Sequence, residues 1–462
     1  MLYILFIVTA IFVFCAGVFR TGNRFNPLTF YIGFWGLWTI VSLNNPFTLN
    51  DVTSRTYLIV WVHVIITSVG FLLINQGNIQ KRVIIKEISA YEFLLSKKFL
   101  ILQLFTLLVL AYFYRKYNLL LSSMSILDSR RIVYEQGLLF GSSVSTIFYS
   151  WIITPIVKVS ILLLLSNLIL NGRKNVSLWI SMVNCILFSF IGGGRFVFFE
   201  IIFFVLIAFG FKYDMFKKIT VNFKKVKRIN KLFYATVILF GVYFMNLNTA
   251  KRLGISSPSL RESIDIFTNT SIKQMALYFI GPFRTLDYFL TAKIAEVTGH
   301  TLGRSFFSGV EEIFNTFLIF FSRNGMSLHT ANEVSSSFTV QSIVIGNNIT
   351  FNAFYSAIMN FYLDGGILLV ILLSALLGIV MALAYKYYLA NTNILTFSLL
   401  VFMTYQLVAT EFRWNYSAPG TCIAIGVLVF LHRRHAKKSL IAEEDSLQTP
   451  NPFLSFNGRK QF

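Results

Sequence analysis

Charged residues are scarce in this chain. They make up 13 % of its 462 residues, whereas hydrophobic residues make up 56 % and the mean hydropathy is +0.68. A soluble globular protein carries roughly 25 % charged residues. The composition therefore excludes a soluble globular protein and predicts an all-α polytopic membrane protein.

Acidic residues are scarcer still, with 19 Asp+Glu against 40 Lys+Arg and a formal net charge of +21. A chain this hydrophobic cannot gather its basic residues on one solvated face, so a nucleic-acid partner is not expected. The excess of positive charge is typical of the lysine and arginine bias in the cytoplasmic turns of membrane proteins.

Cysteines and the common catalytic motifs are also missing or few. The three cysteines, Cys15, Cys185 and Cys422, lie in or beside apolar segments, and their spacing predicts neither a disulfide nor a zinc site. The chain has no Walker A, Rossmann, HExxH or nucleophile-elbow motif in a suitable context. We therefore expect no cofactor and no metal. Any chemistry takes place outside or within the membrane, on a substrate that arrives activated.

Eleven segments, with a range of ten to twelve, are long and apolar enough to predict transmembrane helices. We expect an N-terminal bundle of about eight spans over residues 1–247 and a large external loop with surface helices over 248–364. Further spans over 365–432 and a disordered cytoplasmic tail over 433–462 follow. The segments are 2–19, 28–43, 57–74, 99–114, 147–170, 177–191, 196–211, 233–247, 366–385, 394–410 and 421–432.

Basic turns predict the orientation. Residues 212–231 hold eight basic residues and one acid, and residues 75–98 hold five basic residues. With eleven spans these turns share one side, which the positive-inside rule assigns to the cytoplasm. The N-terminus is then external and the C-terminus is cytoplasmic. Within the long loop, 274–292 and 306–321 predict helices on the membrane surface or over the bundle, or else a twelfth span or a re-entrant pair.

The basic residues change identity across the membrane. The expected cytoplasmic side holds 16 Lys and 8 Arg, whereas the external side holds 11 Arg and 4 Lys. Arginine offers a planar pair of donors to phosphate or carboxylate. The external excess therefore favours a site for an anionic ligand, although contacts with lipid headgroups and local carboxylates are the simpler alternative. The external arginines are Arg55, Arg115, Arg130, Arg131, Arg195, Arg252, Arg261, Arg284, Arg304, Arg323 and Arg413.

Several of these residues stand in distinctive contexts. Arg195 follows three glycines at an external turn between two spans, where glycine permits close approach of a ligand to the backbone. Asp364 precedes Gly365-Gly366 where an apolar run begins, and it either caps the span or lines a cavity. His300 and His329 are the two histidines of the long loop, and either could act as a general base.

Two charges lie inside expected spans, Lys158 in TPIVKVSILL and Glu200 in FVFFEIIFF. Each is costly against lipid, so both should face the bundle, where they can pair with each other. A structural ion pair is the simpler interpretation, and a role in proton transfer is the alternative.

Three stretches resemble the Wzy-type O-antigen polymerases, the oligosaccharide repeat-unit polymerases. They are the opening up to NNPFTLNDVTSRTYLIVW, the Gly-Gly-Gly-Arg195 turn, and FNAFYSAIMNFYLDGGILLVILLSALLG after the long loop. The architecture is similar too, with a dominant external loop late in the chain. The family's Arg-x10-Gly pattern in external loops is matched by Arg130 and Gly141 in RRIVYEQGLLFG. The long loop holds no second copy.

The resemblance implies a glycosyltransferase that polymerises undecaprenyl-diphosphate-linked oligosaccharides for O-antigen, a component of lipopolysaccharide, or for a related surface polysaccharide. External arginines would bind the departing diphosphate, and an acid or histidine would deprotonate the acceptor hydroxyl. The implied location is the bacterial inner membrane, with the external N-terminus in the periplasm. The bilayer and a chain-length regulator protein are implied partners. Candidate catalytic residues are Arg195, Arg284, Asp364 and His300, and candidate substrate-binding residues are Arg130, Arg131, Gly141, Arg304, Arg323 and Arg413.

Two other functions fit parts of the sequence. An O-antigen ligase, or another lipid-linked glycosyltransferase, would share the architecture and the donor. A polysaccharide flippase or transporter would also span the membrane many times, but such proteins commonly show internal repeats and broken helices in pairs. The hydropathy of this chain shows no such repeat, so the sequence favours the polymerase.

Overall fold

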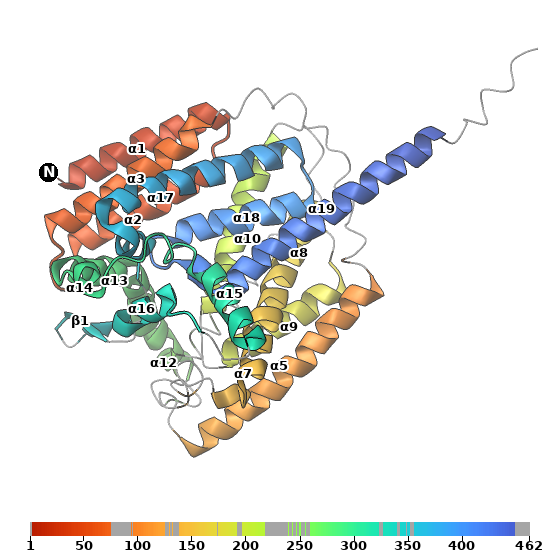
Figure 1. Ribbon diagram of the computed structural model, residues 1–462, viewed down its shortest axis with the longest axis horizontal. Coiled ribbons are helices and arrows are strands. Elements are labelled where there is room, and N and C mark those ends of the chain that lie inside the picture. Colours follow the sequence, from red (N-terminus) through yellow and green to blue (C-terminus); the bar gives the residue numbers. More distant parts are fainter. Residues whose placement is uncertain are drawn as a thin grey trace, which may run out of the picture.

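The computed structural model describes residues 2–74, 94, 96–124, 129, 132, 138–172, 174–191, 196–217, 239, 243, 246, 249–250, 255, 259–322, 327–339, 342–347, 349–351 and 355–448. Helices account for nearly all of its regular structure (Figure 1). The N-terminal half contains α1 (Leu2–Thr21), α2 (Pro27–Asn44), α3 (Ser54–Leu73), α5 (Lys97–Ser123), η2 (Leu138–Phe140), α7 (Ser143–Ile147), η3 (Phe148–Ile153), α8 (Thr154–Asn171), α9 (Val176–Phe190) and α10 (Phe196–Lys217).

The second half contains the elements of the expected external loop and the last helices. They are α12 (Leu260–Asp265), η4 (Ile266–Ser271), α13 (Ile272–Thr291), α14 (Ile294–Thr298), α15 (Ser308–Phe321), α16 (Ala331–Thr339), β1 (Ile343–Gly346), β2 (Ile349–Phe351), α17 (Ala357–Ala390), α18 (Ile394–Ala409), η5 (Asn415–Ser417) and α19 (Pro419–Gln448). The two strands form one antiparallel pair.

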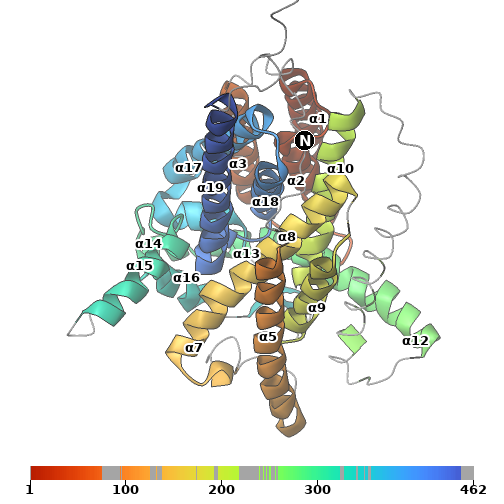
Figure 2. The same cartoon turned by 90° about the vertical axis from the view of Figure 1, so that its right-hand side faces the viewer.

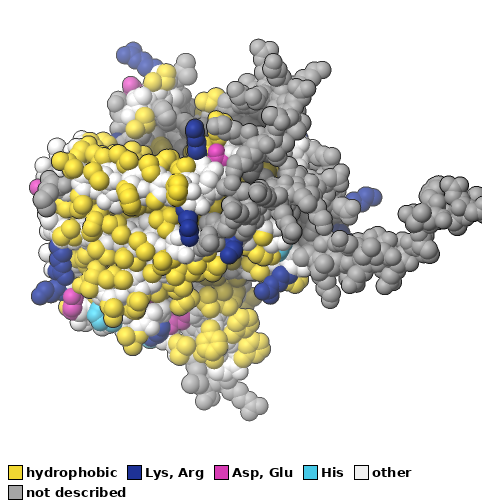
Figure 3. Space-filling view, turned by 90° about the horizontal axis from the view of Figure 1, so that it is seen from above, with side chains coloured by type: hydrophobic (Ala, Val, Ile, Leu, Met, Phe, Trp, Pro, Cys, Tyr) yellow, Lys and Arg dark blue, Asp and Glu magenta, His cyan; other side chains and the backbone are white. Residues whose placement is uncertain are grey.

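Six helical stretches in the described part of the chain are long and apolar enough to cross a membrane. They are 2–21, 54–73, 97–123, 143–171, 196–214 and 357–390. Their outer surfaces are apolar, as the exposed Val8, Ile11 and Phe12 of α1 illustrate. Hydrophobic side chains likewise dominate the face seen in Figure 3, where charged side chains are few. Water cannot cover so large an apolar surface without cost, so the protein is embedded in a membrane.

Ten of the eleven expected spans coincide with helix in the structure. The remaining one, 233–247, lies almost wholly outside the described residues. Two of the ten, α9 and α18, are shorter apolar helices of 15 and 16 residues. Helix is therefore confirmed in those ten places, while the count of eleven spans stays a prediction.

The closest helix pair joins α3 to α17. A Cβ atom at Gly70 would collide with the Ala375 carbonyl, and one at Gly378 would collide with the Thr67 carbonyl. Small residues on both helices thus allow the two backbones to touch, as in many membrane helix pairs. The His63 ring of α3 is buried at the same interface, with Nδ1 2.6 Å from the Ser374 hydroxyl. This packing fixes α17 relative to the start of the bundle.

A break interrupts α17 at the two glycines where the sequence predicts that a span begins. Gly365 has φ 175° and Gly366 has φ 62° and ψ −154°, and neither is helical. The Gly366 conformation is open almost only to glycine. The helix is thus divided into a short half, ending at Asp364, and a long apolar half.

The elements between residues 259 and 351 gather at one end of the molecule, opposite the C-terminal end of α19 (Figures 1 and 2). The β1–β2 pair reaches the α2–α3 connection, where the Asn50 amide donates to the Ile345 carbonyl at 2.7 Å. The charge pattern assigns this end of the molecule to the external side, and the orientation itself stays a prediction.

The C-terminal tail differs from expectation. We expected disorder over 433–462, but α19 continues to Gln448. The segment RRHAKKSLIAEEDSLQ contains neither glycine nor proline and is rich in strong helix formers, which explains the extension. We predicted disorder because the tail contains acidic and polar residues and shows no hydrophobic periodicity. Residues 449–462 lie outside the described part.

Candidate functional site

Asp364 is the last residue of the short half of α17, and both of its carboxylate oxygens accept hydrogen bonds. Its Oδ1 accepts from the Thr301 hydroxyl at 2.6 Å and from the Ser305 amide at 2.8 Å, while Oδ2 accepts from the Phe306 amide at 2.8 Å. The carboxylate is buried. It neither caps the following half-helix nor lines an open cavity, the two roles that the sequence left open. Its geometry is that of an anchor for the 300–306 loop.

His300 is held on the same turn. Its Nδ1 lies 3.2 Å from the Leu363 carbonyl oxygen, and a carbonyl only accepts, so Nδ1 carries the proton. The other nitrogen, Nε2, is then the free base, and it has no hydrogen-bond partner among the residues the structure describes. The ring is exposed. A neutral histidine that is fixed in this tautomer on an exposed residue can accept a proton from a bound hydroxyl.

The loop that carries His300 adopts a conformation that few residues favour. Gly299, Leu302 and Gly303 all have positive φ, of 82°, 53° and 89°. Leucine rarely adopts such a φ, and the strain is offset here because the Leu302 amide donates to the Asp364 carbonyl at 2.9 Å. The loop is therefore shaped by its bonds to the end of the short half-helix.

Arg55 reaches the neighbouring residue of that half-helix. Its Nη2 lies 3.4 Å from the Tyr362 hydroxyl. Arg55 is exposed and forms no ion pair with a described acidic residue. Arg55 and His300 thus contact consecutive residues of the short half of α17. The sequence placed Arg55 among the external arginines but gave no reason to choose it, because the contact with Tyr362 spans about 300 positions of the chain.

Two charged residues of α13 position the turn that presents Arg55. The Arg284 guanidinium is buried and donates to the Ser42 carbonyl at 3.0 Å, to the Asn50 carbonyl at 3.2 Å and to the Ser42 hydroxyl. Burial lowers the pKa of this guanidinium. Asp287 accepts at Oδ1 from the Thr53 hydroxyl at 2.5 Å. Arg284 thus binds one carbonyl in the last turn of α2 and one in the connection after it, so its donors are used within the protein.

Arg304 lies in the 300–306 loop but is partly neutralised. Its guanidinium pairs with Glu311 at 2.5 Å and also donates to the His329 carbonyl. The His329 ring itself pairs with Glu333 at 2.7 Å on an exposed surface. The structure therefore connects the 300–306 loop, which contains His300 and Arg304, to Asp364 at the end of the short half of α17. The His329 ring is instead paired with Glu333.

Arg413 and Gly141 lie in other turns. The Arg413 guanidinium stands 5.6 Å from the centre of the ring of Phe196, the first residue of α10. Gly141 has φ 78° in the turn between η2 and α7, with Lys116 Nζ 3.7 Å from where a Cβ would stand. Neither has a described contact with His300 or Arg55. Arg130, Arg131, Arg195 and Arg323 lie outside the described residues, so their placement stays a prediction.

Glu411 is a buried acid two positions before Arg413. It is 1 % exposed, and neither carboxylate oxygen has a hydrogen-bond partner. Burial raises the pKa of this carboxyl well above its usual range. Burial therefore favours the neutral, protonated form of this carboxyl, which lies between α18 and η5.

The expected pairing of the two intramembrane charges is confirmed. Lys158 Nζ lies 2.8 Å from Glu200 Oε1, and the Tyr405 hydroxyl lies 3.5 Å from the same oxygen. The three residues come from α8, α10 and α18, so the ion pair ties three helices together inside the bundle.

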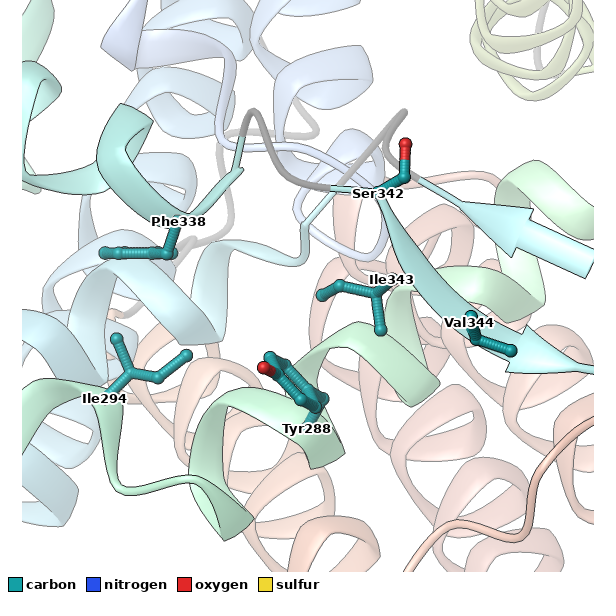
Figure 4. Close-up of a pocket in the computed structure, with 6 residues that line it drawn as sticks. All are labelled: Tyr288, Ile294, Phe338, Ser342, Ile343 and Val344. Atoms are coloured by element: carbon teal, nitrogen blue, oxygen red, sulfur yellow. The ribbon is translucent and has the colours of Figure 1, made fainter.

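A pocket of about 320 Å³ lies beside the site (Figure 4). Its lining is uncharged, and in Figure 4 Phe338 and Ile294 face each other on one side while Ile343 and Tyr288 meet on the other. Phe289 connects it to the site, since its ring lies 5.4 Å from Phe338 and 6.2 Å from Tyr362 between centroids. The pocket is lined by Tyr288, Ile294, Phe338, Ser342, Ile343 and Val344.

The described residues include no cluster of three or more His, Cys, Asp and Glu side chains with the geometry to hold a metal ion. No protein-family model matches the sequence, and no curated protein or solved structure is similar to it. Function must therefore be argued from the site itself.

Proposed function

We propose that the protein is a membrane glycosyltransferase that polymerises undecaprenyl-diphosphate-linked oligosaccharide repeat units on the external face of the bacterial inner membrane. The product would be O-antigen or a related surface polysaccharide. The sequence resemblance to the Wzy-type polymerases suggests this activity, and the site supplies the chemical groups that it needs.

One observation supports the proposal most. Two consecutive residues just before the break in α17 contact a base and a cation. The Leu363 carbonyl accepts a hydrogen bond from the base, His300, and the Tyr362 hydroxyl contacts the cation, Arg55. Glycosyl transfer from a lipid diphosphate needs a base for the acceptor hydroxyl and a cation for the leaving diphosphate. Both groups are exposed at the end of the molecule that the charge pattern makes external.

In the proposed reaction, the acceptor hydroxyl gives its proton to His300 Nε2 as its oxygen attacks the anomeric carbon of the donor. The bond between that carbon and the diphosphate oxygen breaks, and undecaprenyl diphosphate leaves. Arg55 binds the diphosphate as negative charge accumulates on it, and Arg304 contributes the part of its charge that Glu311 does not neutralise. The reaction transfers a sugar that is already activated, so it needs no nucleotide.

The pocket beside the site suits the glycan. An aromatic ring with a hydroxyl, as in Tyr288, presents a flat apolar face and a polar edge, which matches the faces and edges of a sugar ring. Because its lining residues carry no charge, the pocket would separate the neutral sugars from the anionic diphosphate near Arg55.

Deletion of the gene followed by gel analysis of surface polysaccharide tests the proposal. Loss of a polymerase leaves single repeat units on the core or carrier. A deletion mutant with uncapped core and intact long polymer on the carrier would instead indicate a ligase. Repeat units trapped on the cytoplasmic side would indicate a flippase, and either pattern would contradict the polymerase.

A further inference from the structure

Helix α15 has its polar face turned toward the protein. Glu311 Oε2 accepts from the Ala331 amide at 2.8 Å, and Glu312 Oε1 accepts from the Thr330 hydroxyl at 2.7 Å. One turn further on, Asn315 Oδ1 accepts from the Leu328 amide at 2.7 Å. The polar residues of α15 are therefore satisfied by the segment that leads into α16.

The opposite face of α15 is apolar and points away from the protein. Val310, Phe314, Phe317 and Phe321 are spaced by four, three and four positions, which places them in one stripe along the helix. They are 52 %, 58 %, 53 % and 81 % exposed. A surface helix of a water-soluble protein has the reverse arrangement, with its apolar stripe inward. The stripe therefore needs an apolar environment outside the chain.

The neighbours of α15 indicate what that environment is. A Cβ at Gly309 would meet the Cys422 sulfur at 3.0 Å, so the first turn of α15 packs on the first turn of α19. Halfway along α15, the Phe317 ring lies 6.3 Å from Trp151, in η3 just before α8. Both contacts are with the expected external ends of transmembrane helices. The stripe is thus continuous with the lipid-facing surface of the bundle, and Figure 2 shows α15 projecting outward from it.

We propose that α15 is immersed in the external leaflet of the bilayer, with the stripe of Val310, Phe314, Phe317 and Phe321 against lipid acyl chains. The helix then anchors the preceding loop at the membrane surface, because Arg304 is paired with Glu311 on the polar face of α15. His300 would be held at the height of the lipid headgroups. The inference does not depend on the proposed function, since it follows from the packing of α15 alone.

Site-directed spin labelling tests the immersion. The full-length protein, with Cys15 replaced by serine, is reconstituted into phosphatidylethanolamine–phosphatidylglycerol vesicles with a nitroxide on Phe317→Cys. Oxygen concentrates among acyl chains and a nickel chelate stays in water. We expect oxygen to relax the Phe317 label several-fold more effectively, relative to the nickel chelate, than it relaxes a label on Ser336→Cys. Ser336 is the matched control, because it is exposed on the polar helix α16.

Two results would overturn the proposal. Nickel accessibility at position 317 equal to that at 336 would place the stripe in water. Shielding of position 317 from both reagents would mean that protein covers it. A second label on Phe314→Cys gives an independent reading if the first variant is poorly folded, since both side chains are exposed and their replacement removes little packing.

Discussion

The Nδ1 of His300 donates to the Leu363 carbonyl oxygen at 3.2 Å, and this contact decides which ring nitrogen is the base. Leu363 belongs to a half-helix that ends at a glycine break, so its carbonyl is available to a side chain rather than to the next turn. The histidine is consequently held by the break itself. The residue is exposed, so a substrate hydroxyl can reach the ring.

Replacing His300 by alanine removes the proposed base. We expect the rate of glycosyl transfer to fall by roughly 10²–10⁴-fold, the contribution typical of general base catalysis. His329→Ala is the matched control, because that histidine lies in the same loop region and pairs with Glu333. Transfer assays on both purified variants test this, and equal activities would remove His300 from the mechanism.

Arg55 is expected to bind the diphosphate. Arg55→Gln should raise KM for the lipid-linked donor about tenfold or more. Arg55→Lys should raise KM less than Arg55→Gln does but still above the parent value, because lysine keeps the charge and lacks the paired donors. The control is Arg115→Gln, which changes an exposed arginine in the half of α5 that we expect to be external. A normal KM for Arg55→Gln would contradict this role.

Gly366 should tolerate no side chain. A Cβ there meets no atom within 4 Å, but the backbone has φ 62° and ψ −154°. Gly366→Ala therefore tests conformation alone, and we expect a loss of about 1–3 kcal/mol in the free energy of unfolding. Gly33→Ala in α2 also meets open space, with ordinary helical backbone, and should not destabilise. Thermal unfolding in detergent compares them, and equal midpoints would mean that the break is not strained.

Glu411 predicts a pH dependence of stability. Its folded-state pKa is raised by burial, so the native carboxyl keeps a proton that the unfolded chain releases above about pH 4.3. Stability then falls as pH rises above that value. Glu411→Gln removes this loss of stability with rising pH, because glutamine does not ionise. The variant should therefore unfold at a higher temperature than the parent at pH 8 but not near pH 4. A difference in unfolding temperature that is constant with pH would show that Glu411 is not buried in this way.

Local features of the fold could be predicted from the sequence. Hydrophobic runs predicted helices in ten segments because lipid requires each span to satisfy its own backbone. The glycine pair after Asp364 marks the start of an expected span, and the structure has its helix break there, at a backbone conformation that few residues other than glycine adopt. The pairing of Lys158 with Glu200 followed from the cost of leaving either charge in lipid.

The partners of the external residues could not be predicted in the same way. Asp364 binds a loop about 60 positions earlier, and Arg284 binds carbonyls more than 200 positions away. No residue spacing predicts contacts between positions so far apart. Arg284 was therefore predicted to bind a ligand, although its guanidinium donates to carbonyls of the protein. No sequence pattern distinguished Arg55 from the other external arginines, because only its contact with Tyr362 connects it to the site.

Reconstitution tests the central claim most directly. The purified protein in lipid vesicles is given a chemically defined undecaprenyl-diphosphate-linked repeat unit, and products are separated by length. The account predicts a ladder of two or more repeats, release of undecaprenyl diphosphate in equal number to the new linkages, and loss of both in His300→Ala. A repeat unit that crosses the vesicle membrane unchanged, or stays unchanged in the presence of active protein, would contradict it.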